Sequence, residues 1–256
     1  MSHAMVAFNP APPGKHHPAP WRAARAGYAF DILIEISIPA SAIRPEGLSD
    51  EDVIWWIAAL IRLCGYPYAI VPVISDFPFA EGASSKDELS LKPFETENRF
   101  LHAGPEPQPL DAYSLQWIKE KWAPGAKLLA QNPKLKSSLQ ALDACTVKNK
   151  TSASLLAVWG GLEQLFAPSA GELRFRVASY ISSYLEPLGP KRLEMFKRIL
   201  KLYDERSSAA HTARDGDARS LADSWLLLRA ALLKMIDDDK VPSQSDLESL
   251  LFCDQP

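Results

Sequence analysis

The sequence has few of the residues that form metal and redox sites. Its three cysteines lie far apart at Cys64, Cys145 and Cys253, without metal-ligand spacing, which predicts reduced thiols in a cytoplasmic protein. It has only five histidines, and the adjacent pair His16 and His17 has no third ligand nearby, so we expect no metal and no cofactor. The sequence also lacks an apolar run of transmembrane length and the apolar core of a signal peptide, so no membrane contact is expected.

Charge and composition narrow the class of protein. A net charge of −3 argues against wholesale nonspecific binding of nucleic acid, although it leaves room for a local basic cleft. With 256 residues, 47% hydrophobic and 23% charged, the chain has the composition of a soluble globular protein. Its 21 prolines crowd residues 10–20 and 105–109 and become rare after residue 133. This distribution predicts an irregular Pro-rich arm at 1–26, a small α+β domain at 27–103, a linker at 104–110, a helical domain at 111–240, and an acidic tail with a short helix at 241–256.

The predicted α+β domain combines strands with one helix. Apolar side chains occupy every second position of residues 28–38, which predicts a half-buried strand. Ser49 is predicted to cap a helix that ends near Cys64, and further strands are expected at 68–74 and 94–101. This part of the sequence has no glycine-rich phosphate loop, metal cluster or nucleophile elbow, so it says little about function.

From residue 112 onward the hydrophobic periodicity is helical. It predicts a bundle of six helices and then a short helix near the C-terminus, with Ser245 and Glu248 as its capping box. The first helix is expected to stop at Pro124-Gly125. The apolar stripes of the six helices fall within residues 115–122, 135–145, 155–166, 173–185, 193–206 and 221–235. The predicted fold class is therefore an α+β N-terminal domain followed by an all-α bundle.

Arg206 breaks the apolar stripe of its helix. Apolar residues recur at helical spacing from Leu193 to Tyr203, and one further step of three reaches Arg206. A guanidinium at a core position keeps its charge, so it needs an anionic partner or a wet cleft. His211, five residues later, titrates near neutral pH. Together they predict a site for an anionic ligand, with phosphate as the first candidate.

Two stretches resemble the Apea-like group of HEPN domains. Residues 155–166, with the sequence LLAVWGGLEQLF, are similar to the first conserved helix of that group. Residues 201–211, KLYDERSSAAH, are similar to its Arg-x(4–6)-His motif, here formed by Arg206 and His211. The resemblance covers about residues 112–238 and leaves the N-terminal part unassigned. Ser207 stands where active members often carry Asn, Asp or His.

The resemblance implies an all-α fold that dimerises, with two Arg/His pairs facing each other across the interface. Many members are metal-independent ribonucleases of toxin–antitoxin or antiviral systems, in which a ribose 2′-hydroxyl attacks the adjacent phosphate. We therefore expect a homodimer with RNA as its substrate, acting as a toxin or defence effector with an antitoxin or regulatory partner that the sequence does not identify. Ala213 replaces the tyrosine of members that pair with a nucleotidyltransferase antitoxin, so that partnership is not expected.

This chemistry suits the two residue types. A positioned histidine contributes about 10²–10⁴-fold for each proton transfer, and arginine offers a charged fork for phosphoryl oxygens. One chain supplies one such histidine, whereas a symmetric dimer supplies two. On a regular helix His211 points roughly 140° away from Arg206. The helix must therefore end or distort near His211 for the pair to act together.

Further residues are candidates for supporting roles. Glu163, on the helix that matches the family, either pairs with Arg206, orients His211 or is solvated. The other supporting candidates near the motif are Tyr203, Asp204 and Ser207, and the weaker RNA-binding candidates are Lys197, Lys201 and Arg214. Asp204 and Arg214 either touch the site or lie at the surface, and the basic residues either line an RNA groove or form a solvated face.

A second function is compatible with the same residues. A catalytically inactive HEPN dimer can serve as a nucleotide- or protein-binding module. Arg206 is then a structural ion-pair partner of Glu163, and backbone carbonyls at the helix end satisfy His211.

Overall fold

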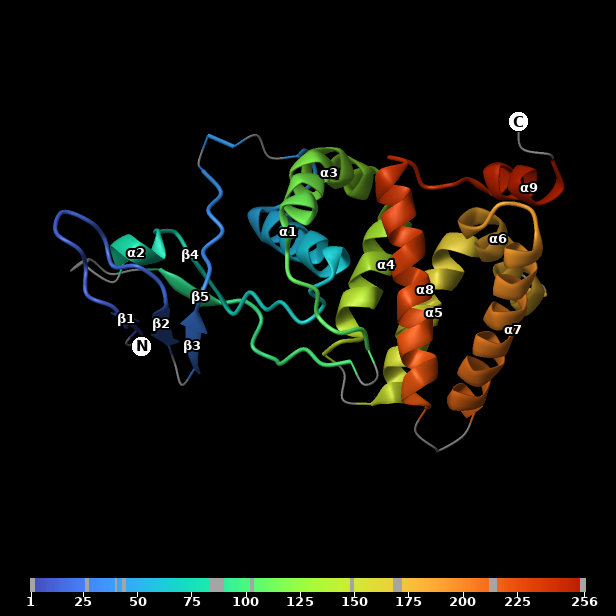
Figure 1. The fold of residues 1–256 in the computed structure, drawn as a ribbon, viewed down its shortest axis with the longest axis horizontal. Coiled ribbons are helices and arrows are strands. Elements are labelled where there is room, and N and C mark those ends of the chain that lie inside the picture. The colour runs from blue at the N-terminus through green and yellow to red at the C-terminus, as the bar shows by residue number, and fades with distance from the viewer. Residues whose placement is uncertain are drawn as a thin grey trace. The chain divides into compact units, whose positions relative to one another are not determined.

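The protein consists of two compact units, seen here in a computed structural model that describes residues 3–25, 28–39, 41–42, 45–82, 90–101, 104–147, 150–167, 172–211 and 216–253 (Figure 1). The first, called here the sheet unit, comprises Met1–Ile43 and Ile70–Asn98. The second, called the helical unit, comprises Arg44–Ala69 and Arg99–Pro256. Among the described helices, none combines the length and the apolar character needed to span a bilayer.

The sheet unit contains two small antiparallel sheets. Strands β1 (His3–Ala7), β2 (Trp21–Arg25) and β3 (Tyr28–Ile32) pair in that order, and β4 (Val73–Ser75) pairs with β5 (Leu91–Pro93). A one-turn helix, α2 (Phe79–Gly82), places Phe79 6.2 Å from Trp21, ring centroid to ring centroid. These two rings lie in a small core that also contains Ala23, Ile32, Val73 and Leu91.

The strands differ from those expected. β1 and β2 lie within the segment predicted to be an irregular arm, and β3 ends at Ile32 although the alternation continues to Ile38. The reason is pairing: β2 supplies backbone partners only to residues 28–32, and the chain beyond them leaves Leu33 71% and Ile34 79% exposed. The strands expected at 68–74 and 94–101 are replaced by β4 and β5, which are shorter and shifted.

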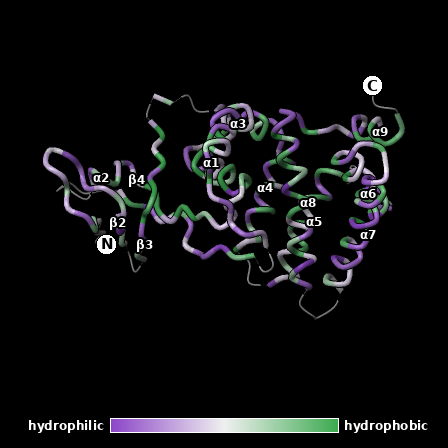
Figure 2. Tube along the Cα trace, viewed as in Figure 1, coloured by the Kyte–Doolittle hydropathy of each residue, from purple (hydrophilic) through white to green (hydrophobic). Residues whose placement is uncertain are grey.

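The helical unit has α5 at its centre. Helix α5 (Thr151–Phe166) contacts α4 (Pro133–Ala144), α6 (Leu173–Leu185), α7 (Pro190–His211) and α8 (Ala218–Asp237). Helix α9 (Gln244–Phe252) packs on α6. Hydrophobic residues recur between hydrophilic ones along these helices (Figure 2), as the sequence pattern predicts. The predicted stripes of α5 and α8 are confirmed, because all their members are buried: Leu155, Val158, Trp159, Leu162, Leu165, Phe166, Leu221, Trp225, Leu228, Leu232 and Met235.

Helix α1 (Asp50–Cys64) belongs to the helical unit rather than to the predicted α+β domain. Ser49 caps it as predicted, in a capping box with Asp52. Its apolar side packs on α3 (Ala112–Gln131), and Leu60 lies fully buried in the main core. The expected linker at 104–110 is tied to the end of this helix, because Gln108 N donates to the Gly65 carbonyl at 2.8 Å.

Two predicted helix boundaries are wrong. Helix α3 continues through Pro124-Gly125, and the absence of a side chain at Gly125 lets its backbone lie against the ring of Trp56. The indole of Trp56 also donates from Nε1 to the Trp122 carbonyl at 2.8 Å. The capping box of α9 is formed by Ser243 and Asp246, two residues before the expected pair.

Candidate functional site

Arg206 lies in the last turns of α7, on the side that faces α5. The buried residues one and two turns before it are Leu202 and Ile199. Leu193, expected in the same stripe, is 54% exposed, so the stripe is not buried at the start of the helix. Arg206 therefore follows the core line of α7 at the place where that line reaches the surface.

Glu163 on α5 is the anionic partner of Arg206. Its Oε1 and Oε2 lie 3.1 Å and 3.3 Å from Nη2 of the guanidinium, and Oε2 makes the hydrogen bond. The two side chains are 22% and 24% exposed, so the pair is only partly desolvated. Of the alternatives that the sequence left open for Glu163, the structure shows the pairing with Arg206.

Tyr203 holds the guanidinium from a second side. The Arg206 guanidinium carbon lies 5.5 Å from the centre of the Tyr203 ring, a cation–π distance. The Tyr203 ring meets Trp159 edge to face at 5.1 Å, and Trp159 Nε1 donates to Ser224 Oγ at 3.1 Å. Burial, and then the charge of Glu163, raises the pKa of the Tyr203 hydroxyl. Arg206 is thus oriented by α5 and α7 and, through Trp159, by α8.

The pair leaves part of its hydrogen-bonding capacity unused. Among the described residues, neither Arg206 Nε nor Glu163 Oε1 has a hydrogen-bond partner, although both atoms are buried. Oε1 is nearer to Nη2 than Oε2 is, yet its angle does not allow a hydrogen bond, so that contact is electrostatic. A guanidinium bound through one nitrogen is held less firmly than one bound by a bidentate carboxylate.

Two more carboxylates meet beside the end of α7. The hydroxyl of Ser220 contacts Glu205 and also lies 2.8 Å from Asp217 Oδ2. Asp217 caps α8 by accepting from Ser220 N at 2.9 Å, and these hydrogen bonds lower the pKa of its carboxyl. This group was not predicted from the sequence, although Asp-x-x-Ser before an apolar stripe is a recognisable capping pattern.

Within the described part of the chain, the remaining candidates make no hydrogen bond or ion pair with Arg206. Asp204 forms an exposed ion pair with Arg174 on α6 at 2.6 Å, which lowers the pKa of the Asp204 carboxyl. Ser207 is half-buried, and Lys197 and Lys201 are exposed. Lys201 Nζ lies 4.0 Å from a carboxylate oxygen of Glu205.

The predicted helix end near His211 falls where the described residues stop: α7 is helical up to His211, and residues 212–215 lie outside the described part. The side chain of His211 lies outside the described part of the structure, as does the whole of Arg214. The next described residues are Gly216 and Asp217, directly before α8.

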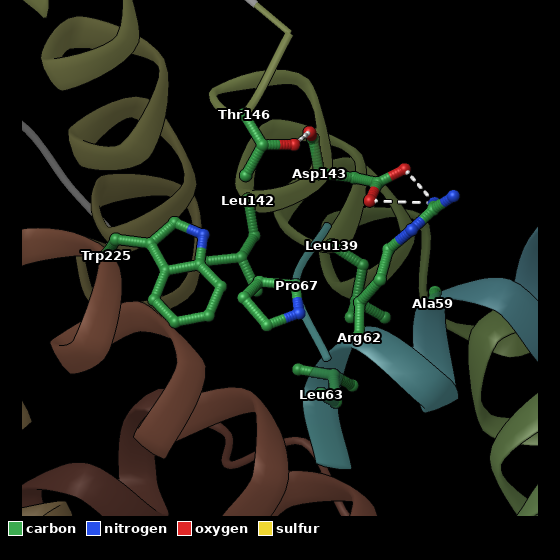
Figure 3. Close-up of a pocket in the computed structure, with 9 residues that line it drawn as sticks. All are labelled: Ala59, Arg62, Leu63, Pro67, Leu139, Leu142, Asp143, Thr146 and Trp225. Atoms are coloured by element: carbon green, nitrogen blue, oxygen red, sulfur yellow. Dashed lines mark hydrogen bonds and ion pairs between the residues drawn. The ribbon is translucent and has the colours of Figure 1, made fainter. Parts of the chain in front are cut away.

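A small cavity elsewhere in the helical unit borders a buried network of ion pairs. Its lining includes Arg62, Asp143 and Trp225, and it has room for about one water molecule (Figure 3). Asp143 accepts hydrogen bonds from Arg62 and Arg99, whose side chains are each 5% exposed, and from Trp55. The described residues contain no group of His, Cys, Asp or Glu side chains able to hold a metal ion.

Comparisons of the chain with protein-family models, with curated proteins and with solved structures find no match.

Proposed function

We propose that the chain is a HEPN-like, metal-independent endoribonuclease that cleaves RNA by attack of a ribose 2′-hydroxyl. In this proposal Arg206 binds the phosphate, and His211 moves a proton to or from the reacting oxygens. The observation that carries it is the position of Arg206: a partly exposed arginine on the core line of α7, five residues before His211.

The position suits a phosphate-binding arginine for a physical reason. A guanidinium keeps its charge at any working pH, and one bordered by low-dielectric core acts more strongly on a developing negative charge than one in water. Leu202, one turn before Arg206, and Trp159, which packs on Tyr203, supply that core. The proposal requires the helix to end or distort near His211, so that the imidazole leaves the direction that a regular helix gives it.

The proposal requires two copies of the chain. Transphosphorylation needs one group to take the 2′-hydroxyl proton and another to protonate the leaving oxygen. A two-fold dimer that brings the ends of two α7 helices together supplies both, one from each His211. A role in a toxin or antiviral-defence system follows from the family resemblance and is part of the same proposal.

The test uses the purified full-length protein with mixed RNAs in EDTA. We expect cleavage by the wild type, and at least a 100-fold slower rate for Arg206→Ala and for His211→Ala. Arg198→Ala is the matched control, because Arg198 lies on the same helix and pairs with Asp223 at the surface. Equal rates in all four proteins, or no cleavage by any of them, would contradict the proposal.

One observation favours a second function. Arg206 is already paired with Glu163 within one chain, which is what a catalytically inactive HEPN dimer that binds a nucleotide or a protein would show. A crystal structure of the dimer separates the two functions: the ribonuclease requires both His211 side chains to face a shared cleft, and the binding module does not.

A further inference from the structure

Glu163 occupies the place that the proposed substrate needs. Carboxylate and phosphate oxygens bind the same guanidinium donors with the same geometry. Both carboxylate oxygens of Glu163 lie within 3.3 Å of Nη2 of Arg206. While the carboxylate remains there, an RNA phosphate has to compete with it for that nitrogen.

The charges around the end of α7 also oppose an incoming phosphate. The carboxylate of Glu163 offsets the charge of Arg206. The carboxylates of Glu205 and Asp217 both contact the hydroxyl of Ser220 at the start of α8. Like charges brought together in a partly desolvated site raise the free energy of binding. Among the described residues, these three carboxylates offset the positive charge of Arg206 and of Lys201, whose Nζ lies 4.0 Å from Glu205.

We infer that Glu163 is an intramolecular stand-in for the substrate phosphate, which keeps the Arg206 site closed until an RNA phosphate displaces it. This inference rests on the proposed function. It adds that the Arg206 site of a single chain is self-inhibited, and that Glu163 acts against RNA binding rather than in support of it.

The contact is one that an anion can replace. The carboxylate uses one of the three guanidinium nitrogens, and both side chains are about a quarter exposed, so water and a competing anion can reach them. Tyr203 still holds the guanidinium by its ring when the carboxylate leaves. Arg206 Nε, which has no hydrogen-bond partner among the described residues, is an additional donor for a phosphate oxygen once the side chain turns.

The experiment measures the affinity of the full-length protein for a fluorescein-labelled single-stranded RNA. The RNA carries 2′-O-methyl groups, so that it binds without being cut. We expect Glu163→Gln to bind about fivefold tighter than the wild type or more, the effect of removing one partly buried ion pair. Because one phosphate contact is gained, the slope of log K against log salt becomes steeper by about 0.7.

Three variants make the result specific. Asp204→Asn removes a carboxylate from the same helix that pairs with Arg174, so it controls for the change in net charge and leaves the affinity nearly unchanged. Glu163→Gln/Arg206→Ala loses the gain, because the gain acts through the arginine. Glu163→Ala repeats the test if the glutamine variant melts at a lower temperature than the wild type.

The outcomes separate the two claims. If folded Glu163→Gln binds RNA no tighter than the wild type while Arg206→Ala weakens binding, the inhibitory role of Glu163 is wrong. The role of Arg206 in binding phosphate is then still supported. An equal gain in Asp204→Asn also contradicts the inhibition, since net charge then explains it. If the double variant binds as tightly as Glu163→Gln, or if no variant binds RNA, the proposed function itself fails.

Discussion

The guanidinium of Arg206 on α7 is paired with the carboxylate of Glu163 on α5, at 3.1 Å, and both side chains remain partly exposed. The sequence alone raised the question of what an arginine does at a core position. The structure answers the question for one chain: it meets a carboxylate 43 positions earlier, at the edge of the core. In the proposed function, the same contact closes a site for an anionic substrate.

Asp143 is predicted to be the most important single carboxylate for the stability of the helical unit. It is 12% exposed and accepts hydrogen bonds from Arg62, Arg99 and Trp55. Asp143→Ala leaves buried cations without their carboxylate and is expected to lower the free energy of unfolding by about 3 kcal/mol or more. Urea unfolding followed by circular dichroism measures the loss. Asp204→Ala, which breaks an exposed pair, is expected to leave the midpoint nearly unchanged, and an equal loss in both variants would refute the argument.

Two glycines in helices are predicted to respond in opposite directions to alanine. A Cβ at Gly125 would lie 2.6 Å from Cζ2 of the buried Trp56 ring, whereas a Cβ at Gly160 would meet no atom within 4 Å. Gly125→Ala is expected to cost about 1–3 kcal/mol through overpacking. Gly160→Ala is expected to add about 0.5–1 kcal/mol, because alanine loses less backbone entropy in a helix. Thermal melting compares the two, and a shift of the same sign in both would show that the packing of α3 on α1 is misjudged.

Helix α9 is predicted to lose an electrostatic contribution at low pH. Hydrogen bonds from Lys240 and Ser243 lower the pKa of Asp246 to about 2. A depressed folded pKa stabilises the folded state above the unfolded value, about 3.9, and the contribution is lost as pH falls through the folded value. The carboxyl carbon shift of Asp246, followed by NMR, should therefore titrate near pH 2. Lys240→Ala should raise that midpoint, and a wild-type midpoint near 4 would contradict the capping geometry.

The helical unit was largely predictable from its sequence, because its helices carry long apolar stripes. The stripes of α5 and α8 fix which faces are buried, and Ser49 identifies the start of α1. The end of α3 was not predictable, since the passage through Pro124 depends on how the preceding turns pack on Trp56. The bounds of the short strands were not predictable for a similar reason. The alternation up to Ile38 indicates a strand, but only the neighbouring strand determines where that strand ends.

The candidate site was predictable in part. Arg206 stands out because it interrupts a periodic pattern, and Glu163 lies on the helix that carries the resemblance. The ion-pair partners of these residues were not predictable from the sequence. Glu163 and Arg206 come together only because α5 packs on α7, and Asp204 pairs with Arg174 on α6. Ser220 and its two carboxylates were missed, since their juxtaposition depends on where α8 starts beside α7.

The most direct test of the proposed RNA cleavage uses an RNA whose principal cut site has been mapped with the wild-type protein in EDTA. A single 2′-deoxynucleotide is then placed on the 5′ side of that cut. The account predicts that cleavage at this position disappears while other positions are still cut, and that the products carry 2′,3′-cyclic phosphate ends. Continued cleavage at the deoxynucleotide, or products with 3′-hydroxyl ends, would contradict it.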